Sequence, residues 1–127
     1  MQRTFGVPAV RVEVRGEGVL LGTDTAVPLG LIVNELLSNA FKYAFANGRP
    51  GTVAVALGPD PEAETGRYQL SVRDDGPGLP ANFAISKASS LGLRLVRSLA
   101  RQLGGTLSLP APGGPGAEFV VSFPVPE

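Results

Sequence analysis

Three short segments of this chain carry side chains that could bind a charged ligand. In the first, Glu35, Asn39 and Lys42 recur at the spacing that places side chains on one stripe of a helix. The amide oxygen of Asn39 can coordinate a hard cation such as magnesium, and the ammonium of Lys42 can neutralise a phosphate. A solvated helix face is the alternative interpretation, because charged side chains are mostly exposed.

The second segment runs from Asp74 to Gly78 and follows an apolar stretch that is typical of a strand. A carboxylate at a strand end is held rigidly and can accept a hydrogen bond from an exocyclic amino group such as that of adenine. Guanine has an acceptor at that position and would leave the carboxylate unpaired. Gly76 and Gly78 allow the backbone to approach a flat ring. The alternative is a plain Asp-Gly turn, and Asp75 is assigned to solvent.

The third segment, Ser90-Leu91-Gly92, precedes a helix. Free amide groups and the helix dipole at such a start favour a polyphosphate, and a glycine there allows close approach. A helix start with an incidental glycine is the alternative. A stripe of arginines follows along the same helix, as a solvated face or a partner surface: Arg94, Arg97 and Arg101.

Two helices and six strands are predicted to position these segments. The first helix is capped within 23–25, has Pro28 in its first turn and ends near Phe45, and the second spans 91–103 and stops at a Gly-Gly pair. A mobile loop is expected over 79–89. The predicted strands are 10–14 with a hairpin partner at 19–21, 52–57, 68–72, 106–109 and 118–123. This order predicts an α+β fold, a two-layer sandwich whose mixed, mostly antiparallel sheet carries the helices on one face.

Composition limits the chemistry. The 127 residues suit one domain, and 11 basic and 11 acidic side chains cancel, so no net field favours nucleic acid. Without cysteine or histidine, disulfides, thiolate chemistry and zinc sites are not expected. No apolar run approaches a membrane span and the amino terminus lacks a secretory signal, so a cytoplasmic domain without membrane contact is expected.

Taken together, the three segments resemble the ATP-binding catalytic domain of sensor histidine kinases, within the superfamily of gyrase, Hsp90 and MutL. Residues 29–45 resemble that family's asparagine box, 74–78 its first glycine box and 90–96 its second, and 116–124 its closing strand. The subgroup with a glutamate in the asparagine box and a short lid, often called HisKA_2 or HWE, is the more similar one. The resemblance implies the Bergerat-type ATP-binding fold over the single domain 1–127.

The resemblance also implies roles for individual residues. Asn39 would coordinate Mg²⁺, with Glu35 acting through bound water or helping to deprotonate the acceptor, and Asp74 would bind the adenine amino group. The remaining residues expected to contact ATP are Lys42, Tyr43, Gly76, Gly78, Ser90, Leu91, Gly92 and Leu93. Ser90 departs from the glycine common in relatives, and the lid is too short for a phenylalanine box, for which Phe83 is a poor substitute. Lys87 could reach the γ-phosphate.

A histidine kinase phosphorylates a histidine, and this chain has none. Two interpretations follow. In the first, the chain is the catalytic domain of a longer kinase, without that kinase's histidine-bearing dimerisation domain and with a response regulator downstream. In the second, it is a free-standing serine kinase of the anti-sigma-factor type. The subgroup resemblance favours the first. A nucleotide-binding module without turnover ranks last, and a monomer with little turnover in isolation is expected.

Overall fold

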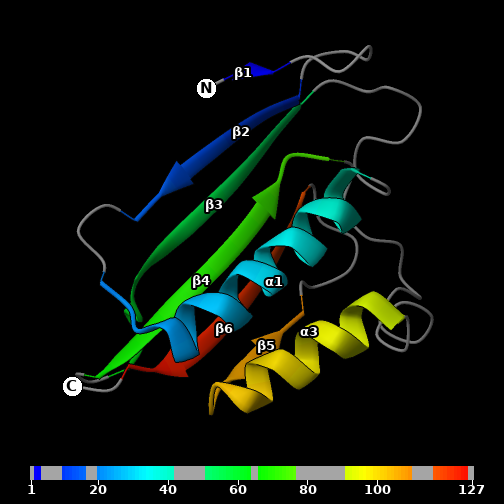
Figure 1. Cartoon of the computed structure of the whole chain (residues 1–127). Helices are drawn as coiled ribbons and strands as arrows, with labels where there is room; N and C mark the ends of the chain where they lie inside the picture. The colour runs from blue at the N-terminus through cyan, green and yellow to red at the C-terminus, as the bar shows by residue number, and fades with distance from the viewer. Residues whose placement is uncertain are drawn as a thin grey trace.

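The computed structural model describes residues 2–3, 10–16, 20–41, 51–63, 66–76, 91–109 and 116–125. They form a six-stranded sheet in the order β1-β2-β3-β4-β6-β5 and two long helices (Figure 1). The strands are β1 (Gln2–Arg3), β2 (Val10–Arg15), β3 (Gly51–Pro59), β4 (Arg67–Asp74), β5 (Thr106–Ser108) and β6 (Ala117–Pro124). The helices are α1 (Thr23–Asn39) and α3 (Leu91–Gln102).

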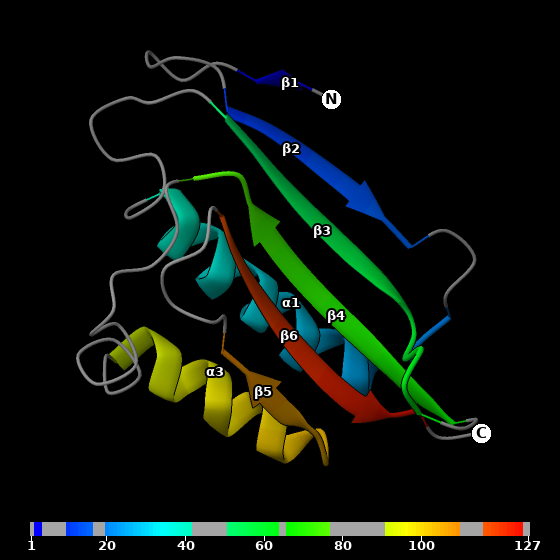
Figure 2. The same cartoon turned by 180° about the vertical axis from the view of Figure 1, so that it is seen from behind.

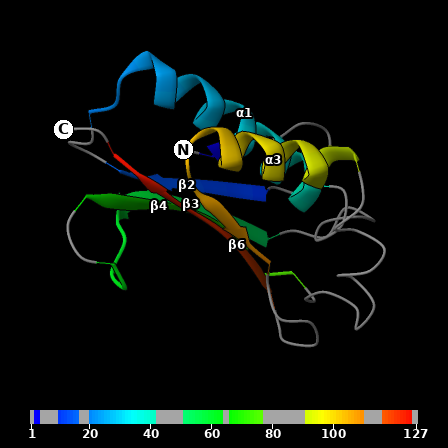
Figure 3. The same ribbon diagram turned by 90° about the horizontal axis from the view of Figure 1, so that it is seen from below.

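Both helices lie on the same side of the sheet, as the view from below shows (Figure 3). In the view from behind, β3, β4 and β6 lie in front of them (Figure 2). All neighbouring strands pair antiparallel except β2 and β3, which are parallel. The predicted α+β sandwich with a mixed, mostly antiparallel sheet and helices on one face is therefore confirmed.

The predicted hairpin partner of β2 is wrong. Leu20 and Leu21 lie outside any strand, and β2 pairs with β1 and, in parallel, with β3. A parallel pair needs a long crossover, which here is α1. Alternation within 10–14 predicts a strand with two different faces but does not identify its partner, so the sequence pattern could not choose between a hairpin and a crossover.

Helix α1 begins differently from the prediction. Gly22 is the N-cap, no side chain caps the first turn, and Pro28 lies inside the helix, beyond the first turn. The described helix ends at Asn39, followed by a π-helical turn at Ala40 and Phe41, and the predicted continuation to residue 45 lies outside the described residues. None of the described helices is both long and apolar enough to cross a membrane.

The core lies between the helices and the three central strands. Val53 on β3 and Val121 on β6 are fully buried, as are Ile32 on α1 and Val96 on α3. In β6 the core residues alternate with half-buried or exposed ones, as expected for a strand covered on one face. Helix α3 ends as predicted, because Gly104 adopts φ +76° and the Gly105 N–H bonds to the carbonyl of Ala100 at 2.9 Å.

Replacing Gly30 by alanine should stabilise the protein. Gly30 is exposed within α1 and a Cβ there would meet nothing within 4 Å. We expect the free energy of unfolding to rise by about 0.5–1 kcal/mol, because alanine loses less backbone entropy. Urea denaturation followed by circular dichroism measures it. Gly104→Ala is the control and should destabilise, because a Cβ there is strained at φ +76° and meets Pro124 Cγ at 3.3 Å. A lower midpoint for Gly30→Ala would contradict the assignment of α1.

Asp60, which directly follows β3, should make the free energy of unfolding depend on pH. The Ser122 hydroxyl donates to Asp60 Oδ2 at 2.7 Å, and the Glu62 N–H donates to Asp60 Oδ1 at 3.0 Å. These bonds, the serine bond first, hold the pKa of Asp60 below its ordinary value of 3.8.

Because the pKa of Asp60 is lower in the folded state, its bonds stabilise the fold above pH 3.8, and this contribution is lost as the pH falls through the folded pKa. We expect Asp60→Asn to flatten the acid limb of the unfolding free energy, measured by urea titrations at a series of pH values. Ser122→Ala should reproduce most of that effect. An unchanged acid limb in both variants would exclude this account.

Candidate functional site

Three predicted site residues meet where α1 ends and α3 begins. A Cβ added at Gly92 would lie 2.8 Å from Glu35 Oε2 and 3.9 Å from Asn39 Oδ1. The two oxygens therefore project from successive turns of α1 toward the first turn of α3. Glu35 and Asn39 are therefore not on a purely solvated face, because both residues are partly buried and their oxygens lie near a second helix.

The packing of the core residues on the two helices brings Glu35, Asn39 and Gly92 close together. On α1, Ile32 and Leu36 are 0% and 1% exposed, and on α3, Leu93 and Val96 are 1% and 0% exposed. With these side chains facing the sheet, the stripe of Glu35 lies beside the core and faces α3. Because Gly92 has no side chain, the first turn of α3 leaves room for a carboxylate.

The oxygens of Glu35 and Asn39 suit a divalent cation. A carboxylate and an amide oxygen are hard donors, and Mg²⁺ typically takes one or two carboxylates and leaves the rest of its coordination to water and substrate phosphates. The described residues contain no group of three or more His, Cys, Asp or Glu side chains that could hold a metal alone. The pair is therefore compatible with a partial magnesium site that a phosphate-bearing ligand would complete.

Asp74 lies at the end of β4, on the side of the sheet that the helices cover. It is 8% exposed and is paired in register with Val53 of β3 and Ala117 of β6. The Gly76 N–H donates to Asp74 Oδ1 at 2.9 Å, so the turn after the strand orients the carboxylate. A buried, oriented carboxylate at a strand end is the acceptor that the sequence predicts for an amino group.

Asp75 is exposed, as its assignment to solvent implies, but it also has a structural partner that the sequence analysis missed. Its Oδ1 accepts the Thr52 N–H at 2.9 Å, and its own N–H donates to the Thr52 carbonyl at 3.1 Å. Gly116, which the sequence analysis assigned only to a closing strand, donates its N–H to the Gly76 carbonyl at 2.8 Å. No sequence signal pairs these residues, because they come from three strands that are distant along the chain.

The other predicted residues divide into two groups. Leu91 is 82% exposed, whereas Leu93 is buried in the core, so its side chain packs against the protein. The remaining predicted residues lie outside the described residues, and their roles stay predictions: Lys42, Tyr43, Gly78, Phe83, Lys87 and Ser90. The mobile loop predicted over 79–89 lies outside them as well.

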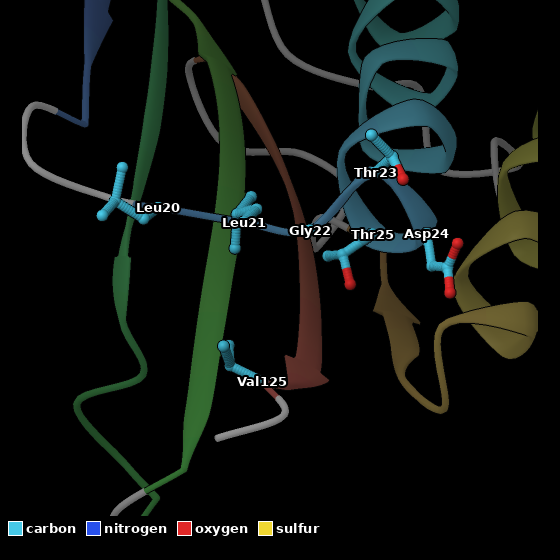
Figure 4. A pocket seen from close by; sticks show the side chains of 7 residues that line it. All are labelled: Leu20, Leu21, Gly22, Thr23, Asp24, Thr25 and Val125. Carbon is cyan, nitrogen blue, oxygen red and sulfur yellow. The ribbon is translucent and has the colours of Figure 1, made fainter.

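A separate pocket of about 420 Å³ lies at the opposite end of α1 (Figure 4). Its lining includes Leu21 and Val125 together with Thr23 and Thr25 at the start of the helix. Thr23 is roughly 24 Å along the helix from Asn39, at about 1.5 Å per residue. This pocket is therefore not part of the Glu35, Asn39 and Gly92 cluster.

Comparison with known proteins places this chain in a known family. Residues 24–127 match the family described as histidine kinase-, DNA gyrase B- and HSP90-like ATPases. Blue-light-activated histidine kinase 2 of Erythrobacter litoralis is 31% identical over 121 residues, which cover 94% of this chain and 34% of that protein. Sensor histidine kinase PdtaS of Mycobacterium tuberculosis is 32% identical over 118 residues, which cover 91% of this chain and 23% of that protein.

The solved structures are similar as well. The histidine kinase domain of an Erythrobacter litoralis blue-light-activated histidine kinase superimposes with a TM-score of 0.75 at 31% identity, covering 91% of this chain and 55% of that one. The present chain thus spans about a third or less of the curated relatives named above.

The contact between Gly92 and Glu35 should appear as an energetic coupling. In Gly92→Ala the new Cβ would meet Glu35 Oε2 at 2.8 Å, so the carboxylate must move. We expect this variant to lack the gain of about 0.5–1 kcal/mol that alanine brings at Gly30. In a Glu35→Ala background the gain should return, giving a coupling energy of about 0.5–1 kcal/mol in a double-mutant cycle. Additive effects would show that the two residues do not touch in solution.

Proposed function

The chain belongs to the histidine kinase-, DNA gyrase B- and HSP90-like ATPase family, and we propose that residues 1–127 form a single domain, the Mg-ATP-binding catalytic domain of a two-component sensor histidine kinase. It donates the γ-phosphate of ATP to a histidine on a separate dimerisation domain, and a response regulator receives the phosphoryl group downstream. The domain acts in the cytoplasm. Two relatives that are themselves named histidine kinases and are 31% and 32% identical support this proposal.

The observation that carries the proposal is the environment of Asp74. Its carboxylate is 8% exposed, lies at the end of a central strand and accepts a backbone N–H from Gly76. That bond orients the carboxylate, which as an ionised group acts only as an acceptor. An exocyclic amino group of adenine satisfies a buried acceptor, whereas the carbonyl of guanine would oppose it.

The residues at the junction of α1 and α3 would bind the phosphate end of ATP. Asn39 and Glu35 supply the oxygen donors for Mg²⁺, Asn39 directly and Glu35 through water. When bound, the metal neutralises charge that develops on the transferring phosphoryl group. Backbone amides at the start of α3, next to Gly92, add the positive end of a helix dipole. Lys42 is proposed as a further cation for the phosphates.

The acceptor must come from outside this chain, because the chain has no histidine. The outer surface of α3 offers a place for it to dock. Leu91 and Leu95 are one turn apart, are 82% and 42% exposed, and flank Gly92 at the phosphate end. We propose that the histidine-bearing domain packs on this apolar strip, which would bring its imidazole to the γ-phosphate.

Nucleotide binding should depend on Asp74. We expect Asp74→Asn to weaken ATP binding at least about tenfold, the equivalent of roughly 1.4 kcal/mol, because the new amide presents a donor or leaves the adenine amino group poorly paired. Calorimetric titration with Mg-ATP measures the dissociation constant. Asp24→Asn makes the same chemical change at an exposed carboxylate at the other end of α1 and should bind like wild type. Equal affinity of Asp74→Asn and wild type would overturn the adenine assignment.

The nature of the acceptor can be tested with radiolabelled ATP. The chain is mixed with a histidine-bearing helical dimerisation domain or with a small serine-bearing antagonist of the anti-sigma type. We expect acid-labile label on the histidine domain and none on the serine protein. Leu95→Asp, on the same strip but not among the residues expected to contact ATP, should reduce that transfer while leaving ATP affinity within about twofold. Acid-stable label on the serine protein would instead identify the alternative kinase.

A further inference from the structure

We propose that Asp75 and Gly116 are positioning residues for Asp74. They hold the backbone on either side of that residue, so that its carboxylate is presented to the base in one orientation. This inference rests on the proposed ATP-binding function. It assigns binding roles to two residues that need not touch the nucleotide.

The first contact ties the end of β4 to the beginning of β3. At every second position of an antiparallel pair, the two opposite residues exchange backbone N–H and carbonyl bonds. Here the Asp75 N–H donates to the Thr52 carbonyl at 3.1 Å, but the Thr52 N–H donates to the Asp75 side chain at 2.9 Å. The carboxylate of Asp75 thus takes the place of a backbone carbonyl. The main chain can turn away toward Gly76 while the residue after Asp74 stays attached to β3.

The second contact closes the other side of the turn. The Gly116 N–H donates to the Gly76 carbonyl at 2.8 Å, just before β6 begins at Ala117. Gly116 adopts φ +75°, and a Cβ there would lie 2.6 Å from the backbone oxygen of Asp74. A backbone oxygen cannot swing aside as a side chain can. Gly116 therefore allows a close approach that a larger residue would prevent.

The two contacts enclose the bond that orients the carboxylate. Gly76 donates its N–H to Asp74 Oδ1 at 2.9 Å, and its carbonyl accepts from Gly116. Displacing either the Asp75 peptide or the Gly76 peptide therefore changes the direction of the Asp74 carboxylate. Asp75 is itself exposed, so water can replace its bond to Thr52 if it is lost. Its removal should affect the orientation of Asp74 more than the stability of the fold.

The test uses the chain with Mg-ATP and with Mg-inosine triphosphate, in which a carbonyl replaces the amino group of adenine. Wild type should prefer ATP. Asp75→Ala should weaken ATP binding by about three- to tenfold and leave inosine triphosphate binding within about twofold, so the preference for adenine shrinks. Asp75→Asn retains an oxygen that can accept from Thr52 and should restore most of the preference. Glu62→Ala, an exposed carboxylate in the turn at the other end of the β3–β4 hairpin, is the control and should change nothing.

A second pair of variants tests Gly116. Gly116→Ala combines a strained φ with a clash against Asp74, whereas Gly66→Ala at φ +91° carries strain alone, because nothing lies within 4 Å of its Cβ. Thermal unfolding first establishes that both variants fold. We expect Gly116→Ala to lose adenine preference and Gly66→Ala to keep it. If Gly116→Ala does not fold, Asp75→Ala and Asp75→Asn decide the question.

The outcomes separate this proposal from the proposed function. If wild type binds no ATP, the proposed function fails, and there is no base for Asp74 to be positioned against. If wild type binds ATP and Asp74→Asn does not, yet Asp75→Ala and a folded Gly116→Ala retain full adenine preference, the function stands and the positioning role is overturned. Equal weakening of ATP and inosine triphosphate by Asp75→Ala would also overturn it, since that pattern indicates a general structural loss.

Discussion

The apolar face of the central strands must be covered, and the rest of the structure depends on how two helices achieve this. Residues such as Val53 and Val121 on the sheet are fully buried only because α1 and α3 pack over them. Two helices placed side by side on one face bring the end of α1 close to the beginning of α3. The hydrophobic effect therefore determines where Glu35, Asn39 and Gly92 meet, although none of them belongs to the core.

At the site itself, the close approach of polar atoms to two glycines determines the arrangement more than the amount of buried area does. Gly92 leaves room for the Glu35 carboxylate, and Gly116 leaves room for the carbonyl of Asp74. The polar atoms lie only 2.8 Å and 2.6 Å, respectively, from where a Cβ would be. These glycines permit close packing between segments, which is a stricter requirement than flexibility in a loop. The proposed nucleotide pocket takes its oxygen donors from helices and strands, whose positions are held by the core.

The sequence predicted much of this arrangement because some patterns depend only on near neighbours. Alternation in β6 and leucine spacing in α3 report which side of each element is buried, and Gly104 reports where α3 stops. The identity of the partner of β2 does not depend on near neighbours. The stretch Val10–Arg15 alternates in the same way whether it forms a hairpin or lies parallel to β3, so its pairing could not be predicted.

The amino-acid sequence by itself determined the chemical types and their order: an acid and an amide one turn apart, an aspartate after an apolar strand, a glycine at a helix start, and no histidine. Those types indicate an ATP-binding site that requires an acceptor from elsewhere. Only the tertiary structure decided that Gly92 faces Glu35, that Asp75 bonds to Thr52 of β3, and that Gly116, just before β6, bonds to Gly76. The physical reason is that hydrogen bonds and close contacts between distant segments arise when the sheet and helices pack, and no local pattern records them.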